Sequence, residues 1–431
     1  MGSITRFNRT CVWVSLVWVL GGIPLTLWLR PSYQDFSAFY MPAVAARCGA
    51  WDALYPTPGK EYVGRDSVPK PAMVHLGAQH HIIGDEPFVY PPCAAVLLYP
   101  LGFFSFPIAH WVWTLFLCAS SWGLALFGGK AFALCAERES RVQGMVVLLT
   151  ACSLLIYRSI RVLNISPFVA LCLIASVFSF MGQFKTAKSL AGGLAMTLGA
   201  GLKLASAALV PLAVAMRQWR TLAVAMVLTA ALLLLSYQMA GRATFVEYFT
   251  RIAPTFGLSS DMVSNKSLQG FLLRATGAAT LPPAIRYAYR ALEAASLAGL
   301  LWLIFRQPYA SWHSPPRVFA ASAALIGWML IFSPLCWEHY FSYLCPFWGW
   351  LIWEASQGPW KRFAALTAIV TQWVPLPILL WLHVPEPINS YMLWGLFVMC
   401  GLAVARLIAQ PRRLSYTNGS GADLASPANS E

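Results

Sequence analysis

Charged side chains are scarce in this sequence. Asp, Glu, Lys and Arg make up only 11% of its 431 residues, whereas 58% are hydrophobic and 14% are aromatic. Soluble globular domains carry about 25% charged residues, so this balance excludes an ordinary soluble protein. Because apolar residues recur along almost the whole length, the composition predicts a polytopic membrane protein.

The signatures of several common enzyme classes are also missing. The sequence has no Walker loop, dinucleotide-binding fingerprint, serine elbow or His/Cys cluster with metal-ligand spacing. His80 and His81 adjoin Asp85 and Glu86, but neighbouring histidines in a polar loop are more often incidental than metal ligands. We therefore predict no metal and no cofactor.

The 10 cysteines lie mostly inside apolar segments. Buried thiols of this kind usually act as small hydrophobic side chains. Cys48 and Cys93 differ, because both fall in one predicted loop on the outer side. The sequence leaves open whether these two form a disulfide.

What the chain does contain is a series of long apolar stretches. A bilayer core of about 30 Å requires roughly 20 apolar residues per helix. Such stretches lie near residues 11–29, 107–127, 142–157, 162–182, 187–217, 221–240, 284–305, 318–335, 339–354, 363–382 and 390–409. Lys203 interrupts the stretch 187–217, which crosses the membrane either once or twice.

The net charge of +14 follows from membrane topology rather than from nucleic-acid binding. Lys and Arg collect in short cytoplasmic loops. The basic residues assigned to this inner side fall between alternate apolar stretches and are Arg6, Arg9, Lys130, Arg138, Arg141, Lys185, Lys188, Arg217, Arg220, Arg306, Arg317, Lys361, Arg362, Arg412 and Arg413. Both termini are then cytoplasmic, so the number of crossings is even and 187–217 crosses twice. We predict an all-α polytopic integral protein of the cell membrane, with about twelve transmembrane helices and no nucleic-acid partner.

Two segments on the predicted extracytoplasmic side are long, residues 30–106 and 241–283. Within the first, residues 93–104 are apolar but too few to span the bilayer. They form either an interfacial helix in the outer leaflet or an extension of the next transmembrane helix. We predict one transmembrane domain over residues 1–414 and a polar, disordered cytoplasmic tail over 415–431.

One carboxylate lies in an unusual setting. Asp35 follows the first apolar stretch and stands among Tyr33, Phe36, Phe39 and Tyr40. Partial burial among aromatic rings raises the pKa of a carboxyl towards the range of a general base. A juxtamembrane Asp is otherwise usually a solvated loop residue, so its position alone leaves both roles open.

Three cations are also candidates for function. A charged group at a helix centre costs at least about 2.5–3.5 kcal/mol on insertion scales, so Lys203 needs a polar cavity or an anionic partner unless it snorkels to the interface. Arg158 and Arg161 occupy a predicted short outer turn. Arginines there suit either a bound phosphate or lipid headgroups.

A third candidate segment, residues 333–340, joins two apolar stretches on the outer side. Pro334 breaks the helix there, and Glu338 and His339 follow it. A histidine can donate to a phosphate or to an acceptor hydroxyl near neutral pH. A lone interfacial histidine is also commonly structural.

Taken in order along the chain, these motifs resemble glycosyltransferase family 87. The series is Asp35-Phe36 with Phe39-Tyr40, Tyr90-Pro91-Pro92 with Pro100-Leu101, Lys203, Asn265-Lys266-Ser267, and Ser333-Pro334 with Trp337 and His339. That family groups polyprenyl-phosphate-mannose-dependent mannosyltransferases and bacterial relatives within the GT-C fold. The chain departs from the family pattern at Leu163-Asn164-Ile165-Ser166, where a Gly-Gln pair is common, and at Tyr340, where a second His is common.

The resemblance implies an inverting transfer of a sugar, mannose above all, from a polyprenyl-phosphate donor to an extracytoplasmic lipid or glycan acceptor. It implies a GT-C-like bundle in contact with membrane lipids, with a lipid groove built from transmembrane helices and residues 93–104. Asp35 would be the catalytic base, assisted by His339. The residues implied in binding the donor phosphate are Lys203, Arg158, Arg161 and Asn265, and those in supporting positions are Tyr40, Tyr90, Trp337 and Glu338.

Two other functions are compatible with the residues. A transporter or a lipid flippase would also need Lys203 and the arginines in a cavity, but it normally has repeated, broken helices with polar groups at the bilayer midplane. We find no internal repeat. A non-catalytic assembly subunit would need no indispensable outer carboxylate.

Overall fold

The computed structural model describes residues 2–30, 33, 35–58, 68–82, 86–137, 140–182, 186–262, 264–373 and 390–409. Most of these residues are helical, and the only extended pairing among them is an isolated bridge between Asn265 and Trp337. The predicted all-α fold is confirmed. The predicted tail over 415–431 lies outside the described residues, as do Arg413, Asp85 and the end of the apolar stretch 363–382.

The first half of the chain forms nine helices within the described ranges. They are α1 (Gly2–Val17), α2 (Ile23–Leu29), α3 (Ser37–Arg47), α4 (Pro71–Gln79), α5 (Pro92–Leu98), α6 (Phe106–Ala136), α7 (Arg141–Ala151), α8 (Leu154–Arg161) and α9 (Ser166–Phe180). A π-helical turn, Trp18–Gly22, joins α1 to α2, and a 3-10 segment, Tyr99–Phe103, follows α5.

The second half continues in the same way. Its helices are α10 (Thr186–Lys203), α11 (Val210–Ala215), α12 (Trp219–Glu247), α13 (Leu268–Thr276), α14 (Pro283–Phe305), α15 (Pro315–Phe332), α16 (Trp348–Ala355), α17 (Pro359–Trp373) and α19 (Tyr391–Ile408). The 3-10 segments that matter for the site are Ala205–Leu209, before α11, and Glu338–Phe347, between α15 and α16.

Seven helical segments in the described ranges are long and apolar enough to cross a membrane. They are Ile4–Leu29, Phe106–Ala136, Arg141–Arg161, Trp219–Thr255, Pro283–Phe305, Pro315–Phe332 and Tyr391–Ile408. The chain is therefore a multi-pass membrane protein, and about twelve crossings stays a prediction.

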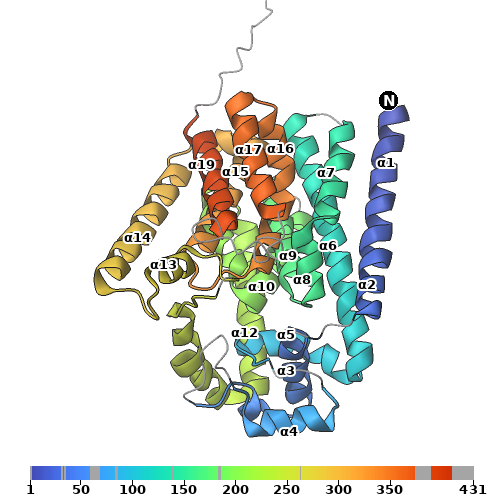
Figure 1. The fold of residues 1–431 in the computed structure, drawn as a ribbon, viewed down its shortest axis with the longest axis vertical. Helices are drawn as coiled ribbons and strands as arrows, with labels where there is room; N and C mark the ends of the chain where they lie inside the picture. Colours follow the sequence, from blue (N-terminus) through green and yellow to red (C-terminus); the bar gives the residue numbers. More distant parts are fainter. Residues whose placement is uncertain are drawn as a thin grey trace, which may run out of the picture.

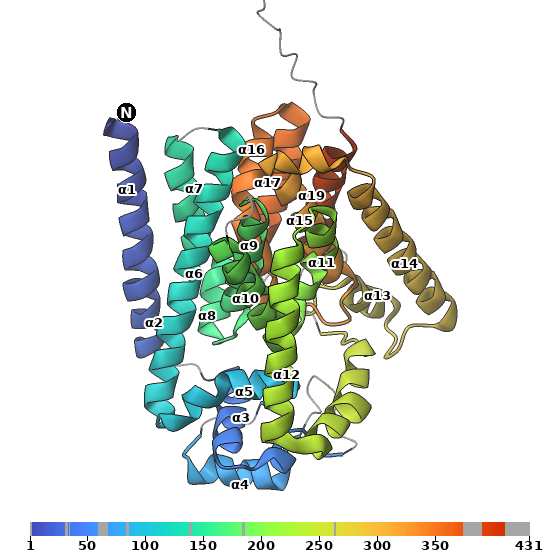
Figure 2. The same cartoon turned by 180° about the vertical axis from the view of Figure 1, so that it is seen from behind.

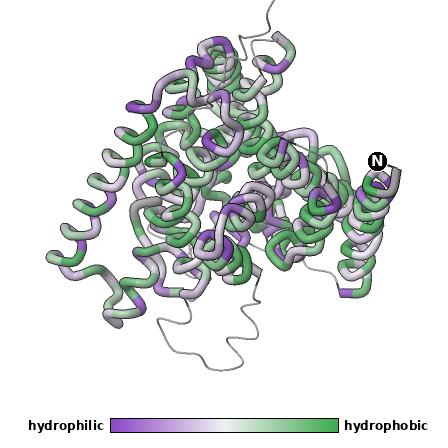
Figure 3. Tube along the Cα trace, turned by 90° about the horizontal axis from the view of Figure 1, so that it is seen from above, coloured by the Kyte–Doolittle hydropathy of each residue, from purple (hydrophilic) through white to green (hydrophobic). Residues whose placement is uncertain are grey.

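The helices form a bundle with a cap at one end (Figures 1 and 2). The cap contains α3, α4, α5 and the far end of α12, and the N-terminus and the end of α19 lie at the opposite end. In the bundle, α15 is apolar and buried on nearly all sides, as expected of a central helix. Outer helices instead expose large apolar side chains, for example Met226 and Leu234 on α12 and Trp302 on α14, and hydrophobic residues follow much of the rim in Figure 3.

The stretch 187–217 is a helical hairpin. Leu204 takes a left-handed backbone conformation, with φ 54°, directly after α10 ends at Lys203. The chain then turns back through Ala205–Leu209 into α11, which packs on α12. This reversal places Lys203 at the tip of the hairpin.

Residues 93–103 are helical, in α5 and the 3-10 segment Tyr99–Phe103, and are not an extension of α6. Phe104 and Ser105 are extended, with ψ 152° and 155°, and separate the two helices. The segment packs closely on α3, because a Cβ at Gly102 would collide with the carbonyl of Ala43. Whether it lies in the outer leaflet stays a prediction.

Three local expectations need correction or completion. The predicted outer loop 241–283 is helical in its first part, since α12 kinks at Gly241, with φ 76° and ψ 167°, and runs on to Glu247. The predicted turn around Arg158 is instead the last turns of α8. Cys48 and Cys93 are both free, and the Cys93 thiol donates to the Gly201 carbonyl at 3.3 Å.

Candidate functional site

A cavity of about 820 Å³ lies between the cap and the bundle. Its polar lining includes Asp35, Arg158, Asn164, Lys203 and His339. Its apolar lining comes from the hairpin, α14 and α15, and includes Leu204, Ala207, Ala208, Pro211, Leu297, Leu325, Trp328 and Met329. The cavity thus has a polar centre and an apolar part. We call the apolar part, lined by the residues of the hairpin, α14 and α15 just named, the apolar arm.

Asp35 is held in this cavity by backbone and aromatic contacts. Its N–H donates to the Val162 carbonyl at 2.9 Å, which ties the segment before α3 to the end of α8. The next residue, Phe36, is fully buried and stacks on Tyr40 with ring centroids 5.5 Å apart. These contacts direct a half-buried carboxylate into the cavity, where Asn164 Nδ2 donates to its Oδ2 at 2.6 Å.

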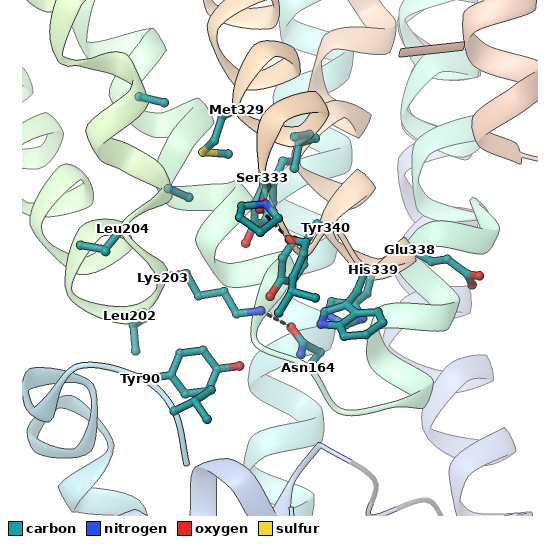
Figure 4. A pocket seen from close by; sticks show the side chains of 18 of the residues that line it. Tyr90, Asn164, Leu202, Lys203, Leu204, Met329, Ser333, Glu338, His339 and Tyr340 are labelled. Carbon is teal, nitrogen blue, oxygen red and sulfur yellow. Dashed lines mark hydrogen bonds between the residues drawn. The ribbon is translucent and has the colours of Figure 1, made fainter. Parts of the chain in front are cut away.

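Lys203 points into the cavity rather than snorkelling away from it. Its Nζ donates to Asn164 Oδ1 at 2.8 Å and to Ser166 Oγ at 3.2 Å. The ammonium also lies 4.3 Å from the ring centroid of Tyr340 and 5.7 Å from that of Tyr90. Figure 4 shows Lys203 aimed at Asn164 between these two rings. The hairpin tip therefore brings a cation to the carboxylate, with one amide between them.

Burial raises the pKa of the Asp35 carboxyl above its ordinary value. The hydrogen bond from Asn164 and the positive charges of Lys203 and Arg158 oppose this rise without cancelling it. A carboxylate of raised pKa binds a proton more tightly, so Asp35 is a stronger base than a solvated aspartate.

His339 and Glu338 follow the break at Pro334. His339 Nε2 is buried and has no hydrogen-bond partner among the described residues, and the ring stands edge-on to Tyr340 at 4.8 Å. Glu338 lines the cavity too, but its side chain points away from Lys203 and Asn164 in Figure 4. Its Oε2 lies 4.0 Å from Arg158 Nε.

The remaining predicted phosphate contacts separate into two groups. Arg158 lines the cavity, with 48% of its side chain exposed. Arg161 and Asn265 are not among the lining residues. Arg161 lies one helical turn further along α8, with its Nη1 buried.

Asn265 contacts the backbone next to the cavity, and its predicted contact with phosphate stays a prediction. The residue is fully buried, and its Nδ2 donates to the Pro334 carbonyl at 3.0 Å. Its Oδ1 accepts from Cys336 N at 2.9 Å, and Lys266 N donates to the Cys336 carbonyl at 2.7 Å. The Asn265-Lys266-Ser267 motif therefore fastens the segment that carries His339.

Among the residues predicted in supporting positions, some line the cavity and one does not. Tyr90 and Trp337 line the cavity, and the Tyr90 ring stacks on Phe39 at 5.4 Å. Tyr40 is buried outside the cavity and donates to the Phe104 carbonyl at 2.7 Å. Residues 93–104, predicted to help build the lipid groove, contribute nothing to the lining.

Asn164, Ser166 and Tyr340 were not among the predicted site residues. Asn164 Oδ1 accepts from Ser166 N at 3.0 Å, a local turn that starts α9 ahead of Pro167. The sequence signal, a short polar pair before a helix-starting proline, indicates only such a turn. Its contact with Asp35 depends on the tertiary fold.

Comparison with known proteins identifies the family. The sequence model of Glycosyltransferase family 87 matches residues 88–334, which include Tyr90, Asn164 and Lys203. No curated protein and no solved structure matches the chain. The family match covers more than half of the sequence and confirms the resemblance drawn from the ordered motifs. The chain therefore belongs to glycosyltransferase family 87 and is a membrane glycosyltransferase.

Proposed function

We propose that this glycosyltransferase is an inverting enzyme of the cell membrane that uses a polyprenyl-phosphate-linked sugar. The sugar is mannose, and the acceptor is a lipid or glycan on the extracytoplasmic face. The observation that carries this proposal is the cavity itself, in which a carboxylate and a lysine share one amide and an apolar arm begins beside them. A lipid-phosphate donor has the matching sequence of groups: sugar, anion and hydrocarbon chain.

In the proposed reaction Asp35 accepts the proton of an acceptor hydroxyl. The hydroxyl oxygen forms a bond to the anomeric carbon as the bond from that carbon to the phosphate oxygen breaks. Attack opposite to the leaving group inverts the anomeric configuration. The products are the glycosylated acceptor and polyprenyl phosphate, and the donor needs no further activation.

Negative charge develops on the phosphate oxygen as it leaves. Lys203 offers an ammonium in the cavity, and Arg158 adds a second cation along the lining. His339 Nε2 has no partner within the described ranges, and burial lowers the pKa of its imidazole, so it would donate to the same phosphate as the neutral Nε2–H tautomer. Groups fixed in advance in a site shielded from water stabilise such charge more strongly than groups in solvent.

The apolar arm suits the prenyl chain next to the phosphate. It is lined by Ala208 and Pro211 of the hairpin, Leu297 of α14, and Trp328 and Met329 of α15. These side chains offer no hydrogen-bonding group except the indole of Trp328, whose Nε1 donates to Ser296 Oγ at 3.0 Å. A hydrocarbon chain fits such a surface, whereas a nucleotide does not.

Ala208→Phe should narrow the apolar arm. We expect KM for a long-chain polyprenyl donor to rise about tenfold, because overpacking costs about 1–3 kcal/mol. KM for a donor with a truncated chain should change little. Ala298→Phe, at an exposed position of α14 outside the lining, is the matched control. If KM rose equally for both donors, the prenyl chain would not bind in this arm.

The dependence of transfer on pH should report the Asp35 carboxyl. A base works only when deprotonated, so transfer falls as pH falls through its pKa. Because burial raises that pKa, kcat/KM should decline at a pH above the ordinary aspartate value of about 3.9. Initial rates between pH 4 and 8 check this, and a rate that stays flat down to about pH 4 would contradict it.

The function is tested with membranes that contain the protein. They are supplied with radiolabelled polyprenyl-phosphate-mannose and a crude lipid extract, beside membranes that lack it. We expect label in a new lipid or glycan product, and the same carrier with other sugars establishes the preference for mannose. Label that crosses the membrane on an unchanged carrier would instead identify a transporter or flippase.

A further inference from the structure

Asn164 connects the carboxylate and the lysine of the cavity. It lies before α9 and is 3% exposed. Its Nδ2 donates to Asp35 Oδ2 at 2.6 Å, and its Oδ1 accepts from Lys203 Nζ at 2.8 Å. Ser166 supplies two further donors to the same Oδ1, its N–H at 3.0 Å and its hydroxyl at 2.7 Å.

These contacts determine which way the amide points. If the Asn164 amide were reversed, its carbonyl oxygen would face the acceptor oxygen of Asp35. Its NH₂ group would at the same time face the ammonium of Lys203 and the N–H of Ser166, which are donors only. The observed orientation satisfies every group, so the donor side of the amide is directed at the carboxylate.

We propose that Asn164 is a positioning residue that aims the Asp35 carboxylate and keeps it apart from the Lys203 ammonium. The proposal rests on the function proposed above, in which the two groups have different tasks. A direct ion pair would make the carboxylate a weaker base and would engage the positive charge that the phosphate needs. With the amide between them, neither group is engaged by the other, and both line the cavity.

The other groups around the carboxylate do not provide this separation. Arg158 on α8 and Lys203 on α10 act on Asp35 through their charge, and the phenols of Tyr90 and Tyr340 also lie within its electrostatic reach. Among the described residues, Asn164 is the one whose side chain bonds to both Asp35 and Lys203. Removing the amide therefore changes the direction of the Asp35 carboxylate and its distance from the Lys203 ammonium.

The test compares Asn164→Ala and Asn164→Asp with wild type and with Ser176→Ala. Ser176 lies on α9, the helix that follows Asn164, and its hydroxyl bonds within that helix, to the Cys172 carbonyl at 2.8 Å. We expect kcat to fall about 10–100-fold in both Asn164 variants, as for a misplaced reacting group, with a smaller change in donor KM. Ser176→Ala should keep wild-type rates.

Two pH readouts separate positioning from a merely structural role. Asn164→Ala removes a hydrogen bond to the carboxylate but lets the Lys203 ammonium approach it, and a direct ion pair stabilises the charged form more strongly, so the inflection of the pH–rate profile should move downward. Infrared titration of the Asp35 carboxyl, identified by its absence in Asp35→Asn, should show the same downward shift without any turnover. An unchanged carboxyl titration in Asn164→Ala overturns the positioning role. Absence of transfer by wild type, with the carboxyl shift present, overturns the proposed function instead.

Discussion

Asp35→Asn should reduce the initial rate of sugar transfer by about 10³-fold, within the range of about 10²–10⁴ that a positioned general base contributes. The amide oxygen of the substituted side chain can still accept from Asn164, so the local packing is kept. What is lost is the proton acceptor. The measurement is label transfer per molecule of protein in membranes, with expression matched to wild type.

Asp52→Asn provides the matched control for this loss. Asp52 is another carboxylate of the cap, but it is exposed and does not line the cavity. Its substitution should leave transfer unchanged. If wild type and Asp35→Asn transferred sugar at equal rates, Asp35 would not be the base. If Asp52→Asn lost as much activity as Asp35→Asn, the loss would reflect a general effect of charge in the cap.

Lys203→Met should have the second largest effect. We expect kcat to fall about 10²–10³-fold, as when a single donor to a developing negative charge is removed, together with weaker saturation by the donor. Met keeps the apolar stem of the lysine, and Asn164 Oδ1 retains its two bonds from Ser166. Steady-state rates over a range of donor concentrations separate kcat from KM.

Lys203→Met should not weaken the fold. A buried ammonium is costly to keep in an apolar helical hairpin, so the thermal midpoint should stay equal to that of wild type or rise. Lys130→Met, at an exposed position of α6 that lies outside the cavity, is the matched control and should change neither rate nor midpoint. Unchanged donor saturation and rate in Lys203→Met would contradict its role at the phosphate.

The class of fold could be predicted from composition because a membrane span needs a long apolar stretch, which is a local property. The hairpin at Lys203 was predicted by counting basic loops, and the structure adds the left-handed Leu204 that reverses the chain. Arg158 was predicted in a turn but lies in the last turns of α8. Polar residues that end an apolar stretch fit a turn as well as the end of a helix.

The contacts within the site were harder to predict from the sequence than the class of fold. Asn265 was predicted to bind phosphate from its place in a polar motif, but its amide fastens the backbone at Pro334 and Cys336. Polar side chains bind substrates and backbone groups alike, so the residue type does not show which of the two a side chain contacts. Asn164 meets Asp35 across 129 positions of sequence, and nothing in the residues between them signals that contact.

The most direct test of the proposed lipid-phosphate donor uses purified protein in lipid nanodiscs with two donors of the same labelled sugar. One carries the sugar on polyprenyl phosphate and the other on a nucleoside diphosphate. We expect transfer from the lipid donor alone, with one molecule of polyprenyl phosphate released for each sugar that reaches the acceptor. Transfer from the nucleotide donor, or sugar transfer without release of polyprenyl phosphate, would contradict the proposed donor.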